Sequence, residues 1–451
     1  MTGDSDRPGE RALSLLDEGG PWRDALDMLL GARGREPALR DAAQVVSGAA
    51  LRDIVAPTEV DGDGDHRAPA IELANTVDAL TNFLAAARRE PVAVLLPAGV
   101  PAWERDRLLG ALDAVELPVD VPGVVFATSG TTGAPKLVFR AWRSLLANAV
   151  SLARTGGFTT ADTMLAGTPL QHAYGFTVAL LGALAGGAEL LLGPLPLTPD
   201  AWARGIAGGA TVVQSVPAMY RWLASSPGGV GAGTGRLRMA VVAGEAVDPG
   251  LVRSWRDATA VPLVVNYGTT ETGPITLDVD QVDGSVGRPL PGVEVRVEAH
   301  ERGGASHEGE LVVRTQPPGP CYLSRDVGIT ADGWFHTGDL GELDARGAIR
   351  LAGRVDERVN IEGNKVDVVE VEAALLEHPA IRECAVAARR QGGGPPRLWA
   401  FVVAGGDVSV ADLRRHLAGR LSPHKIPATF RTLPALPRTA SGKLRRSQLP
   451  S

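Results

Sequence analysis

The chain has 451 residues, which allows two to four domains at roughly 100–200 residues per domain. Hydrophobic residues make up 44% and charged residues 22%, a balance that permits a large buried core and excludes an intrinsically disordered chain. A net charge of −7 and an aromatic content of 4% argue against nucleic acids and anionic membranes as partners.

Only two cysteines are present, too few for a disulfide framework or a cysteine-rich zinc site, so we expect a reducing compartment. The first ten residues lack the basic and apolar regions of a secretory signal. The most apolar stretch, residues 173–188, is shorter than the roughly 18 residues that cross a bilayer, and it predicts a buried helix. We therefore expect a cytoplasmic protein without a membrane span.

In chain order, residues 21–90 carry apolar residues at three- and four-residue spacing, which predicts helices. Short apolar runs at 91–97 and 123–127 predict buried strands. Further apolar runs alternate with helical patterns at 211–213, 239–243 and 261–265. Strands that alternate with helices predict an α/β fold with parallel sheets.

The pattern changes between residues 285 and 355, where short alternating runs lie between Gly and Pro residues and predict antiparallel strands. The tail after Arg354 has helical patterns at 368–378 and near 410–420, and strand patterns near 384–388 and 399–403. The chain is therefore expected to hold a large α/β part followed by a small α+β part.

A segment rich in hydroxyls and glycines, Thr128-Ser-Gly-Thr-Thr-Gly-Ala-Pro-Lys136, directly follows the strand predicted at 123–127. Backbone N–H groups and hydroxyls in such a loop can face phosphate oxygens, and Lys136 adds a positive charge. The segment does not match the P-loop pattern, in which lysine directly follows glycine. The alternative interpretation is a polar surface turn.

Three further motifs follow along the chain. Asn266-Tyr-Gly-Thr-Thr-Glu271 offers an aromatic ring, hydroxyls and a carboxylate after a predicted strand. Trp334-Phe-His-Thr-Gly-Asp339 ends in a carboxylate that can accept hydrogen bonds from a ribose diol. Pro437-Arg-Thr-Ala-Ser-Gly-Lys443 is a Gly/Ser loop near the end of the chain. Taken alone, each is an ordinary turn or tail.

In this order the segments resemble the motifs of the adenylate-forming superfamily, which includes acyl- and aryl-CoA synthetases, AMP-dependent ligases and adenylation domains. The resemblance covers residues 121–446. It implies a large N-terminal α/β domain at 1–355, with several subdomains, parallel sheets and a distorted antiparallel barrel. It also implies a small mobile α+β domain at 356–451. The first subdomain is expected to be shortened, because only 127 residues precede Thr128.

The resemblance assigns ATP binding to Thr128, Ser129, Gly130, Thr131, Thr132, Lys136, Gly244, Glu245, Asn266, Tyr267, Gly268, Thr269, Asp339 and Arg354. Within this set, Tyr267 is expected to cover the adenine and Asp339 to bind the ribose. Thr270 and Glu271 are expected to contact phosphate and Mg²⁺, with Glu271 as the metal ligand.

Two further roles follow from the resemblance. Lys443 is implied to bridge the attacking carboxylate and the α-phosphate, which is electrostatic rather than acid–base catalysis. Asp356, within Gly353-Arg-Val-Asp-Glu-Arg358, is the implied hinge about which the C-terminal domain rotates between two half-reactions.

The segment Pro169-Leu-Gln-His-Ala-Tyr-Gly-Phe176 resembles the histidine-containing segment of acyl- and aryl-CoA ligases. The resemblance assigns the acyl pocket to His172, Tyr174, Gly175, Gln214, Ser215 and Ile275. Amino-acid-activating relatives usually carry an Asp here for the α-ammonium, and its absence between Leu170 and Thr177 favours an acyl or aryl acid. Glu245 leaves a non-α amino acid open, and a core histidine is the alternative interpretation of His172.

After the hinge, Gly363 and Lys365 are expected to approach the thiol acceptor. Asn360 and Glu362 stand where relatives are often basic, which makes phosphopantetheine on a carrier protein an alternative to CoA. The sequence thus predicts an AMP-forming carboxylate ligase that uses ATP and Mg²⁺ and transfers the acyl group to a thiol, with CoA favoured. The alternatives are a stand-alone enzyme that loads a carrier protein and a nucleotide-binding homologue without catalysis.

Overall fold

The computed structural model describes residues 7–56, 68–99, 102–118, 120–129, 135–225, 230, 234–245, 247–299, 308–315, 321–322, 332–355, 358–361, 364–389, 397–421, 423–438 and 444–450. The chain divides into two compact units. One is formed by Met1–Val295 and Val313–Phe335, the other by Arg296–Val312 and His336–Ser451. Among the described residues, no helix is both long and apolar enough to cross a membrane.

The first unit contains an eight-stranded sheet with the order β12-β11-β10-β9-β7-β8-β1-β2. Its strands are β1 (Pro37–Arg40), β2 (Val45–Ser47), β7 (Thr163–Ala166), β8 (Glu189–Leu192), β9 (Val212–Ser215), β10 (Met239–Val242), β11 (Leu263–Thr269) and β12 (Gly273–Leu277). The six central strands are parallel, and β2 and β12 pair antiparallel at the edges. The predicted parallel α/β fold is confirmed.

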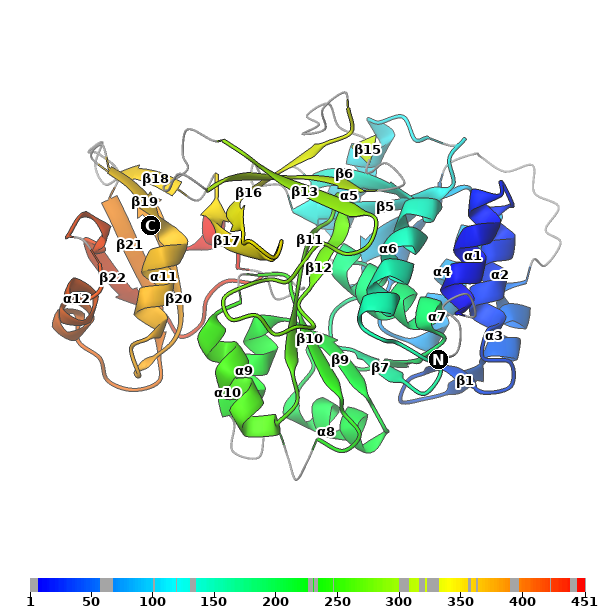
Figure 1. The fold of residues 1–451 in the computed structure, drawn as a ribbon, viewed down its shortest axis with the longest axis horizontal. Helices are drawn as coiled ribbons and strands as arrows, with labels where there is room; N and C mark the ends of the chain where they lie inside the picture. Colours follow the sequence, from blue (N-terminus) through cyan, green and yellow to red (C-terminus); the bar gives the residue numbers. More distant parts are fainter. Residues whose placement is uncertain are drawn as a thin grey trace. The chain divides into compact units, whose positions relative to one another are not determined.

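Both faces of this sheet are buried, because alternate residues of its strands enter different hydrophobic clusters. Met164 lies on one face and Leu165 on the other. One face packs against α6 (Trp142–Thr155), the π-helix η2 (Gly175–Leu181) and α7 (Gly182–Gly186). The opposite face packs against α8 (Pro199–Ala207), α9 (Pro217–Ser225) and α10 (Pro249–Thr259), as Figure 1 shows. The apolar stretch at 173–188 is therefore buried, as predicted.

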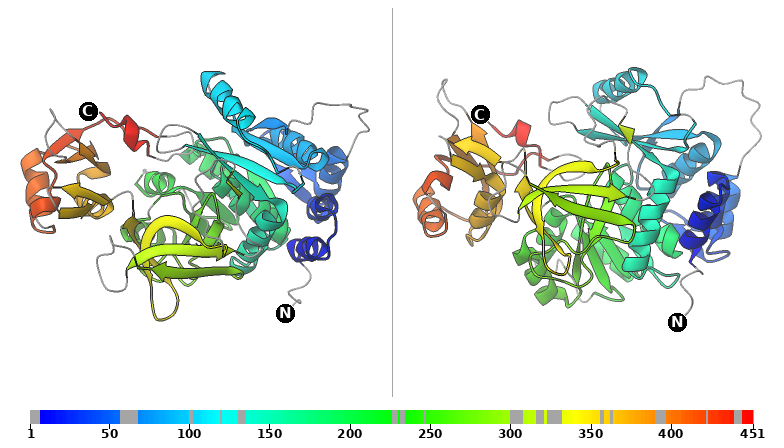
Figure 2. Two further views of the ribbon diagram at one scale, coloured as in Figure 1. Left: turned by 90° about the horizontal axis from the view of Figure 1, so that it is seen from above. Right: turned by 45° about the horizontal axis from the view of Figure 1, so that its top comes forward.

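A second, five-stranded sheet has the order β15-β6-β5-β4-β3. Its strands are β3 (Ala70–Leu73), β4 (Val92–Pro97), β5 (Gly123–Ser129), β6 (Pro135–Ala141) and β15 (Cys321–Tyr322). Leu95 and Phe126 pack on the side of α4 (Val77–Arg89), whereas Val94 and Val125 face Leu108 of α5 (Ala102–Asp113). Helices thus cover both faces of this sheet as well (Figure 2).

The N-terminal region contains α1 (Pro8–Asp17), α2 (Trp22–Gly31) and α3 (Gly48–Val55). Trp22 stacks on Trp142 with ring centroids 5.0 Å apart. The helical prediction for 21–90 is correct for α2, α3 and α4 but wrong for β1, β2 and β3, each of three or four residues. These strands are too short for a period-two pattern, and Leu39 of β1 pairs with Leu190, far away in the sequence.

A four-stranded sheet has the order β13-β14-β16-β17 and consists of β13 (Val293–Glu298), β14 (Gly309–Thr315), β16 (Phe335–Leu343) and β17 (Ile349–Arg354). β16 and β17 are antiparallel, as the Gly/Pro-punctuated pattern predicted.

The C-terminal part of the second unit begins with the hairpin of β18 (Arg358–Ile361) and β19 (Asn364–Asp367). A three-stranded sheet follows, with β20 (Ile381–Arg389), β21 (Arg397–Ala404) and β22 (Thr429–Thr432). Leu375 of α11 (Val368–Leu376) and Leu413 of α12 (Val410–Ala418) pack against Val402 on one face. Trp399 and Phe401 pack on the other, so the small α+β part has a core of its own.

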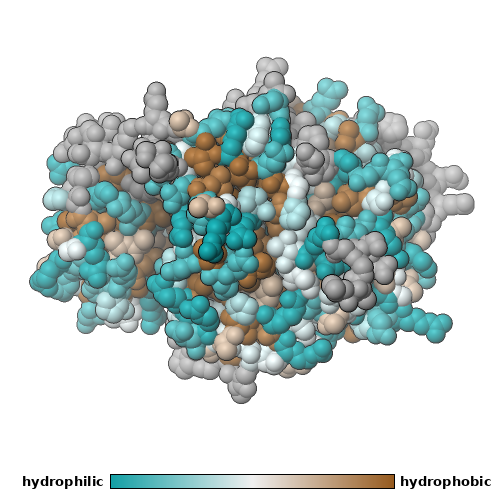
Figure 3. Space-filling view, in the orientation of Figure 1, coloured by the Kyte–Doolittle hydropathy of each residue, from teal (hydrophilic) through white to brown (hydrophobic). Residues whose placement is uncertain are grey.

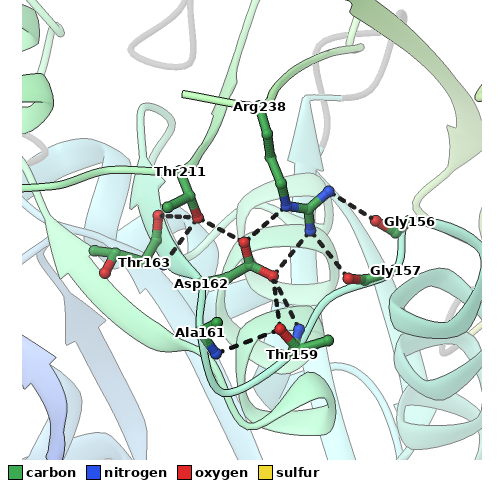
Figure 4. Close-up of polar contacts among 8 residues, drawn as sticks. All are labelled: Gly156, Gly157, Thr159, Ala161, Asp162, Thr163, Thr211 and Arg238. Carbon is green, nitrogen blue, oxygen red and sulfur yellow. Dashed lines mark hydrogen bonds and ion pairs between the residues drawn. The ribbon is translucent and has the colours of Figure 1, made fainter. Parts of the chain in front are cut away.

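An ion pair between a buried carboxylate and an exposed arginine ties the loop before β7 to the start of β10 (Figure 4). Arg238 donates through Nε and Nη2 to the two carboxylate oxygens of Asp162 at 2.8 and 2.9 Å. Thr211 Oγ1 and the Thr159 N–H also donate to this carboxylate, at 2.7 and 2.9 Å. Burial opposes the ionisation of Asp162, but these hydrogen bonds outweigh it and hold the pKa of Asp162 below its ordinary value.

The exposed large hydrophobic side chains among the described residues are Val45, Ile54, Val121, Trp222, Val279, Leu351 and Val410. They belong to different segments, and on the face drawn in Figure 3 hydrophobic residues are interspersed with hydrophilic ones.

Candidate active site

Many of the residues predicted for the pocket and the nucleotide lie at or just beyond the carboxyl ends of four neighbouring parallel strands. β9 ends at Ser215, β10 precedes Gly244 and Glu245, and β11 ends at Thr269. β7 ends at Ala166, shortly before the segment that contains His172. The sheet order β11-β10-β9-β7 therefore brings segments that are far apart in the sequence to one edge (Figure 1). In open α/β sheets this edge is where ligands bind.

The turn after β11 is held by hydrogen bonds within the β11–β12 hairpin. Asn266 Nδ2 donates to the Thr276 carbonyl at 2.6 Å, and the Thr272 N–H donates to Thr269 Oγ1 at 3.0 Å. Tyr267 is 8% exposed, and the strand register shifts immediately after it, at the exposed Gly268. These bonds shape the turn that carries Thr270 and Glu271. Direct contacts of Asn266, Tyr267, Gly268 and Thr269 with a nucleotide stay predictions.

The predicted phosphate loop joins β5 and β6, which form an antiparallel hairpin. Thr128 pairs with Lys136 and Ser129 with Pro135, so β5 continues two residues beyond its predicted end. Gly130, Thr131 and Thr132 lie outside the described residues. The backbone thus places Thr128, Ser129 and Lys136 at the end of the hairpin that holds the loop.

Sequence reasoning missed Arg140, which lies on β6 beyond the phosphate loop and is 1% exposed. Arg140 Nη1 donates to the Thr270 carbonyl at 3.1 Å. Burial lowers the pKa of Arg140 to about 10, although the Glu271 carboxylate raises it. The available signal was a charged residue inside the apolar run from Leu137 to Ala141.

The predicted acyl-pocket residues Tyr174, Gln214 and Ser215 come together beside β9 and β10. The Tyr174 hydroxyl lies 3.1 Å from the carbonyl oxygens of both Ser215 and Val241. Gln214 and Thr168 exchange side-chain hydrogen bonds of 2.7 and 2.9 Å. Burial raises the pKa of Tyr174 far above its ordinary value, so its hydroxyl stays a neutral donor. These polar groups are engaged by the protein itself.

The remaining pocket predictions lie on the same side of the sheet or at its edge. Gly175 begins the π-helix η2, a helix type that often occurs at functional sites. Ile275 is fully buried in β12, and His172 is partly buried in the turn before η2. Their contact with an acyl group stays a prediction.

In the second unit, the predicted ribose carboxylate and its basic neighbour face each other across an antiparallel pair. Asp339 of β16 is opposite Arg354 of β17, and Arg354 Nη1 donates to Asp339 Oδ1 at 2.7 Å. Asp339 is 8% exposed, and its N–H donates to Thr337 Oγ1 at 3.0 Å. The structure thus brings Asp339 and Arg354 together as one ion pair, which orients the carboxylate.

Glu310 is a second residue that sequence reasoning missed. Its carboxylate accepts a hydrogen bond from the Gly338 N–H at 3.0 Å and lies 3.1 Å from His336 Nδ1. Glu310 therefore stabilises the turn immediately before Asp339. The alternating strand pattern predicts Glu310 on the solvent side, although its side chain is only 14% exposed, so the sequence carried no signal for this contact.

The other predicted residues of the second unit are only partly described. Asp356, Gly363 and Lys443 lie outside the described residues. The backbone of Lys365 pairs with Asn360 in the β18–β19 hairpin. Lys425, to which the sequence assigned no role, binds the Glu370 carboxylate with its Nζ at 2.6 and 2.7 Å.

Comparisons with known proteins give matches to both the first and the last part of the chain. The family model for AMP-binding enzymes matches residues 65–323, and the model for the C-terminal domain of AMP-binding enzymes matches 370–443. A mitochondrial malonate–CoA ligase of Mus musculus is 32% identical over 392 residues, covering 74% of this chain and 66% of that protein. A p-hydroxybenzoic acid–AMP ligase of Mycobacterium tuberculosis is 32% identical over 440 residues, covering 94% and 56%. The chain thus spans less than two thirds of the length of these two relatives.

Among solved structures, the o-succinylbenzoate coenzyme A synthetase of Bacillus subtilis in complex with ATP and a magnesium ion is 25% identical. It superimposes with a TM-score of 0.76 over 94% of this chain and 98% of that one. The match of the first family model alone, over residues 65–323, covers more than half of the chain. The chain therefore belongs to the family of AMP-binding enzymes.

Proposed function

We propose that the protein is an AMP-forming carboxylate ligase that activates an acyl or aryl acid with ATP and passes the acyl group to a thiol. The observation that supports this proposal is the common edge of β7, β9, β10 and β11, at which the segments predicted for the pocket and the nucleotide begin or end. Membership in the AMP-binding family supports it independently. The domain boundary at residues 355 and 356 is part of the same proposal.

In the first half-reaction, a carboxylate oxygen of the acid bonds to the α-phosphorus of ATP, and the bond from that phosphorus to the β-phosphate oxygen breaks. The products are acyl-AMP and pyrophosphate. Lys136 and Lys443 supply positive charge to the phosphates, and Asp339 accepts hydrogen bonds from the ribose. No proton is transferred in this step, so catalysis rests on positioning and charge stabilisation.

Glu271 and Thr270 fit a magnesium ion, because a carboxylate and a hydroxyl are hard oxygen ligands on a hydrogen-bonded turn. Magnesium bound there would neutralise charge on the phosphates. The few protein ligands suit this ion, which keeps several waters and binds substrate phosphates as well.

The pocket residues favour an acid without a free ammonium group. Tyr174, Gln214 and Ser215 direct their polar groups to the protein, and the segment from Leu170 to Thr177 holds no carboxylate. Relatives named for malonate and p-hydroxybenzoic acid support small acyl and aryl acids as the first classes to test. Glu245 is partly buried and could pair with an amine on the substrate, so β-amino acids are also among the acids to test.

In the second half-reaction the thiol sulfur attacks the acyl carbonyl, AMP leaves and the thiol proton is released to solvent. CoA is the proposed acceptor, as the names of several CoA ligases among the relatives suggest. Loading of a carrier protein is the second candidate. It is favoured by Asn360 and Glu362, which stand where relatives are often basic, and by a similar nonribosomal peptide synthetase of Salinispora arenicola. We place the reaction in the cytoplasm, where ATP is available.

The test is acid-dependent exchange of labelled pyrophosphate into ATP, measured across aliphatic, aryl and β-amino acids. We expect exchange with at least one acyl or aryl acid and none without added acid. Absence of exchange across the whole panel would contradict the proposal and favour a nucleotide-binding homologue without catalysis.

The acceptor is tested separately in single-turnover assays with the best acid. Thioester formation on free CoA supports the CoA ligase. Thioester formed only on a carrier protein would replace it with the carrier-loading enzyme, while leaving the adenylation step in place.

A further inference from the structure

Arg140 is a charged side chain that the active-site motifs do not explain. Val124 of β5 is opposite Arg140 in the β5–β6 hairpin, and Val124 belongs to the cluster that packs against α6. The same face of β6 therefore directs the guanidinium toward α6, while Leu137 and Phe139 face α5. A side chain that could have been apolar is instead a cation, 1% exposed.

The guanidinium connects two parts of the first unit. Nη2 donates to Ser144 Oγ at 3.1 Å and to Asn148 Oδ1 at 2.5 Å, two residues on one face of α6. Nη1 donates to the Thr270 carbonyl at 3.1 Å. A planar fork can hold three acceptors in fixed directions, which a lysine ammonium on a flexible chain cannot.

The turn after β11 packs directly on this cluster. Gly273 has a φ of +75°, and a Cβ at this position would lie 2.5 Å from Asn148 Oδ1 and 3.1 Å from Arg140 Nη1. The close approach therefore requires glycine here. Arg140 and Asn148 thus form the surface against which the turn from Thr270 to Gly273 rests.

Burying a guanidinium is costly unless hydrogen bonds and an opposite charge compensate it. The three hydrogen-bond acceptors of Arg140 described above are neutral, and the carboxylate that stabilises its charge is that of Glu271. The cation is thus coupled both to the backbone of Thr270 and to the charge of Glu271, the two residues proposed to meet phosphate and magnesium.

We propose that Arg140 is a positioning residue that orients the Thr270–Glu271 turn for magnesium-bound ATP. It acts through the turn and touches neither the metal nor the nucleotide. This inference rests on the proposed function, since the turn is assigned there to ATP and magnesium. It predicts that loss of Arg140 weakens specifically the part of ATP affinity that depends on Mg²⁺.

The test is equilibrium ATP binding to the whole chain, measured with excess EDTA and with excess Mg²⁺. In Arg140→Met we expect the gain in affinity caused by Mg²⁺ to fall about tenfold, the lower end of the effect of removing a residue that supports a metal ligand. The dissociation constant in EDTA should stay within about twofold. Arg140→Lys should lose an intermediate part of the gain, because it keeps the charge but not the fork.

The control is Arg238→Met, which removes a different arginine of the same unit together with its bonds to Asp162 (Figure 4). It should destabilise the fold and leave the Mg²⁺-dependent gain unchanged. If Arg140→Met does not fold, Asn148→Ala removes the 2.5 Å acceptor of Arg140 and should reduce the gain in the same direction, by less.

A kinetic measurement separates positioning from loss of folded protein. If Arg140 positions the turn, Arg140→Met should raise the KM for MgATP and leave the KM for the acid unchanged. If the variant is only partly unfolded, the apparent kcat alone should fall. An unchanged Mg²⁺-dependent gain in the folded variants would overturn the role of Arg140, as would equal weakening with and without Mg²⁺. If the wild-type protein did not bind ATP at all, that result would instead contradict the proposed function.

Discussion

Lysine is rare in this chain, and three of its four lysines stand in segments that the family motifs assign to the active site. Lys136 lies on β6 beside the phosphate loop, Lys365 on β19 and Lys443 in a segment outside the described residues. The fourth, Lys425, is paired with Glu370. A compact ammonium meets a phosphate as a point charge, so the arginine-rich composition makes these lysines the first residues to test.

Replacing Lys443 with alanine removes the charge proposed to act on the α-phosphate. We expect acid-dependent pyrophosphate exchange to fall by at least about 100-fold, the usual effect of losing one transition-state donor. ATP binding measured by equilibrium dialysis should stay within a few fold. Lys425→Ala is the matched control and should keep its exchange rate; undiminished exchange in Lys443→Ala would reject the assigned role.

Asp162 is a residue whose ionisation stabilises the fold (Figure 4). Asp162→Asn should lower the free energy of unfolding at pH 7 by about 2 kcal/mol, the range for a hydrogen bond to a charged group. The folded-state pKa lies below the ordinary value of 3.8, so this stabilisation is present above 3.8 and is lost as pH falls through the folded-state pKa. Urea unfolding at several pH values measures it.

The difference in free energy of unfolding between wild type and Asp162→Asn should therefore become smaller below about pH 4. Asp257→Asn, at an exposed position of α10, is the control and should show a small difference at every pH. If the loss of unfolding free energy in Asp162→Asn stayed constant down to pH 3, it would contradict the link between the ionisation of Asp162 and the stability of the fold.

Among the elements, the β18–β19 hairpin carries the lysine that follows the hinge. Its strands pair Asn360 with Lys365 and Val359 with Val366, and Val366 is fully buried in the core of the small sheet and α11. Nearby, Lys425 of the short helix Pro423–Lys425 binds Glu370 at the start of α11. One end of the hairpin is thus anchored to the α+β core.

Lys365→Ala should stop or strongly slow thioester formation while leaving adenylation intact, because the hairpin is predicted to meet the thiol acceptor only in the second half-reaction. Exchange reports the first step, and transfer from preformed acyl-AMP to CoA reports the second. The matched control Lys425→Ala should leave the second step within about threefold, since an exposed ion pair contributes little. Equal rates for Lys365→Ala and wild type in both steps would reject the prediction.

At the scale of the whole molecule, the family motifs predict that the part after Asp356 rotates between the two half-reactions. Proline fixes φ near −65° and removes the N–H, so Asp356→Pro should restrict this rotation. We expect one half-reaction to slow at least about tenfold more than the other, as for a restricted hinge that controls catalytic steps. Rapid-quench measurement of acyl-AMP and thioester within one turnover separates the two rates.

Asp356→Ala keeps the backbone freedom and is the control, expected to retain both steps within a few fold. A proline variant in which both steps fall equally, or neither falls, would contradict a hinge at this position.

Much of this protein follows from local sequence. The buried strands β4, β5, β9, β10 and β11 appear as apolar runs, and the helices α11 and α12 as three- and four-residue periodicities, because each pattern is set by the element's own residues. The order of the motifs likewise identifies the family, since short segments of defined chemistry are readable without a structure. The strands β1 and β2 were missed because their partners, not their own residues, define them.

The sequence by itself determined the α/β fold class, the family and the chemistry that its motifs offer. Only the tertiary structure decided which of these residues meet. It placed the ends of β7, β9, β10 and β11 at one edge, paired Asp339 with Arg354, and buried Arg140 against the carbonyl of Thr270. The physical reason is that strand order and side-chain contacts join residues distant along the chain, and no local pattern specifies such contacts.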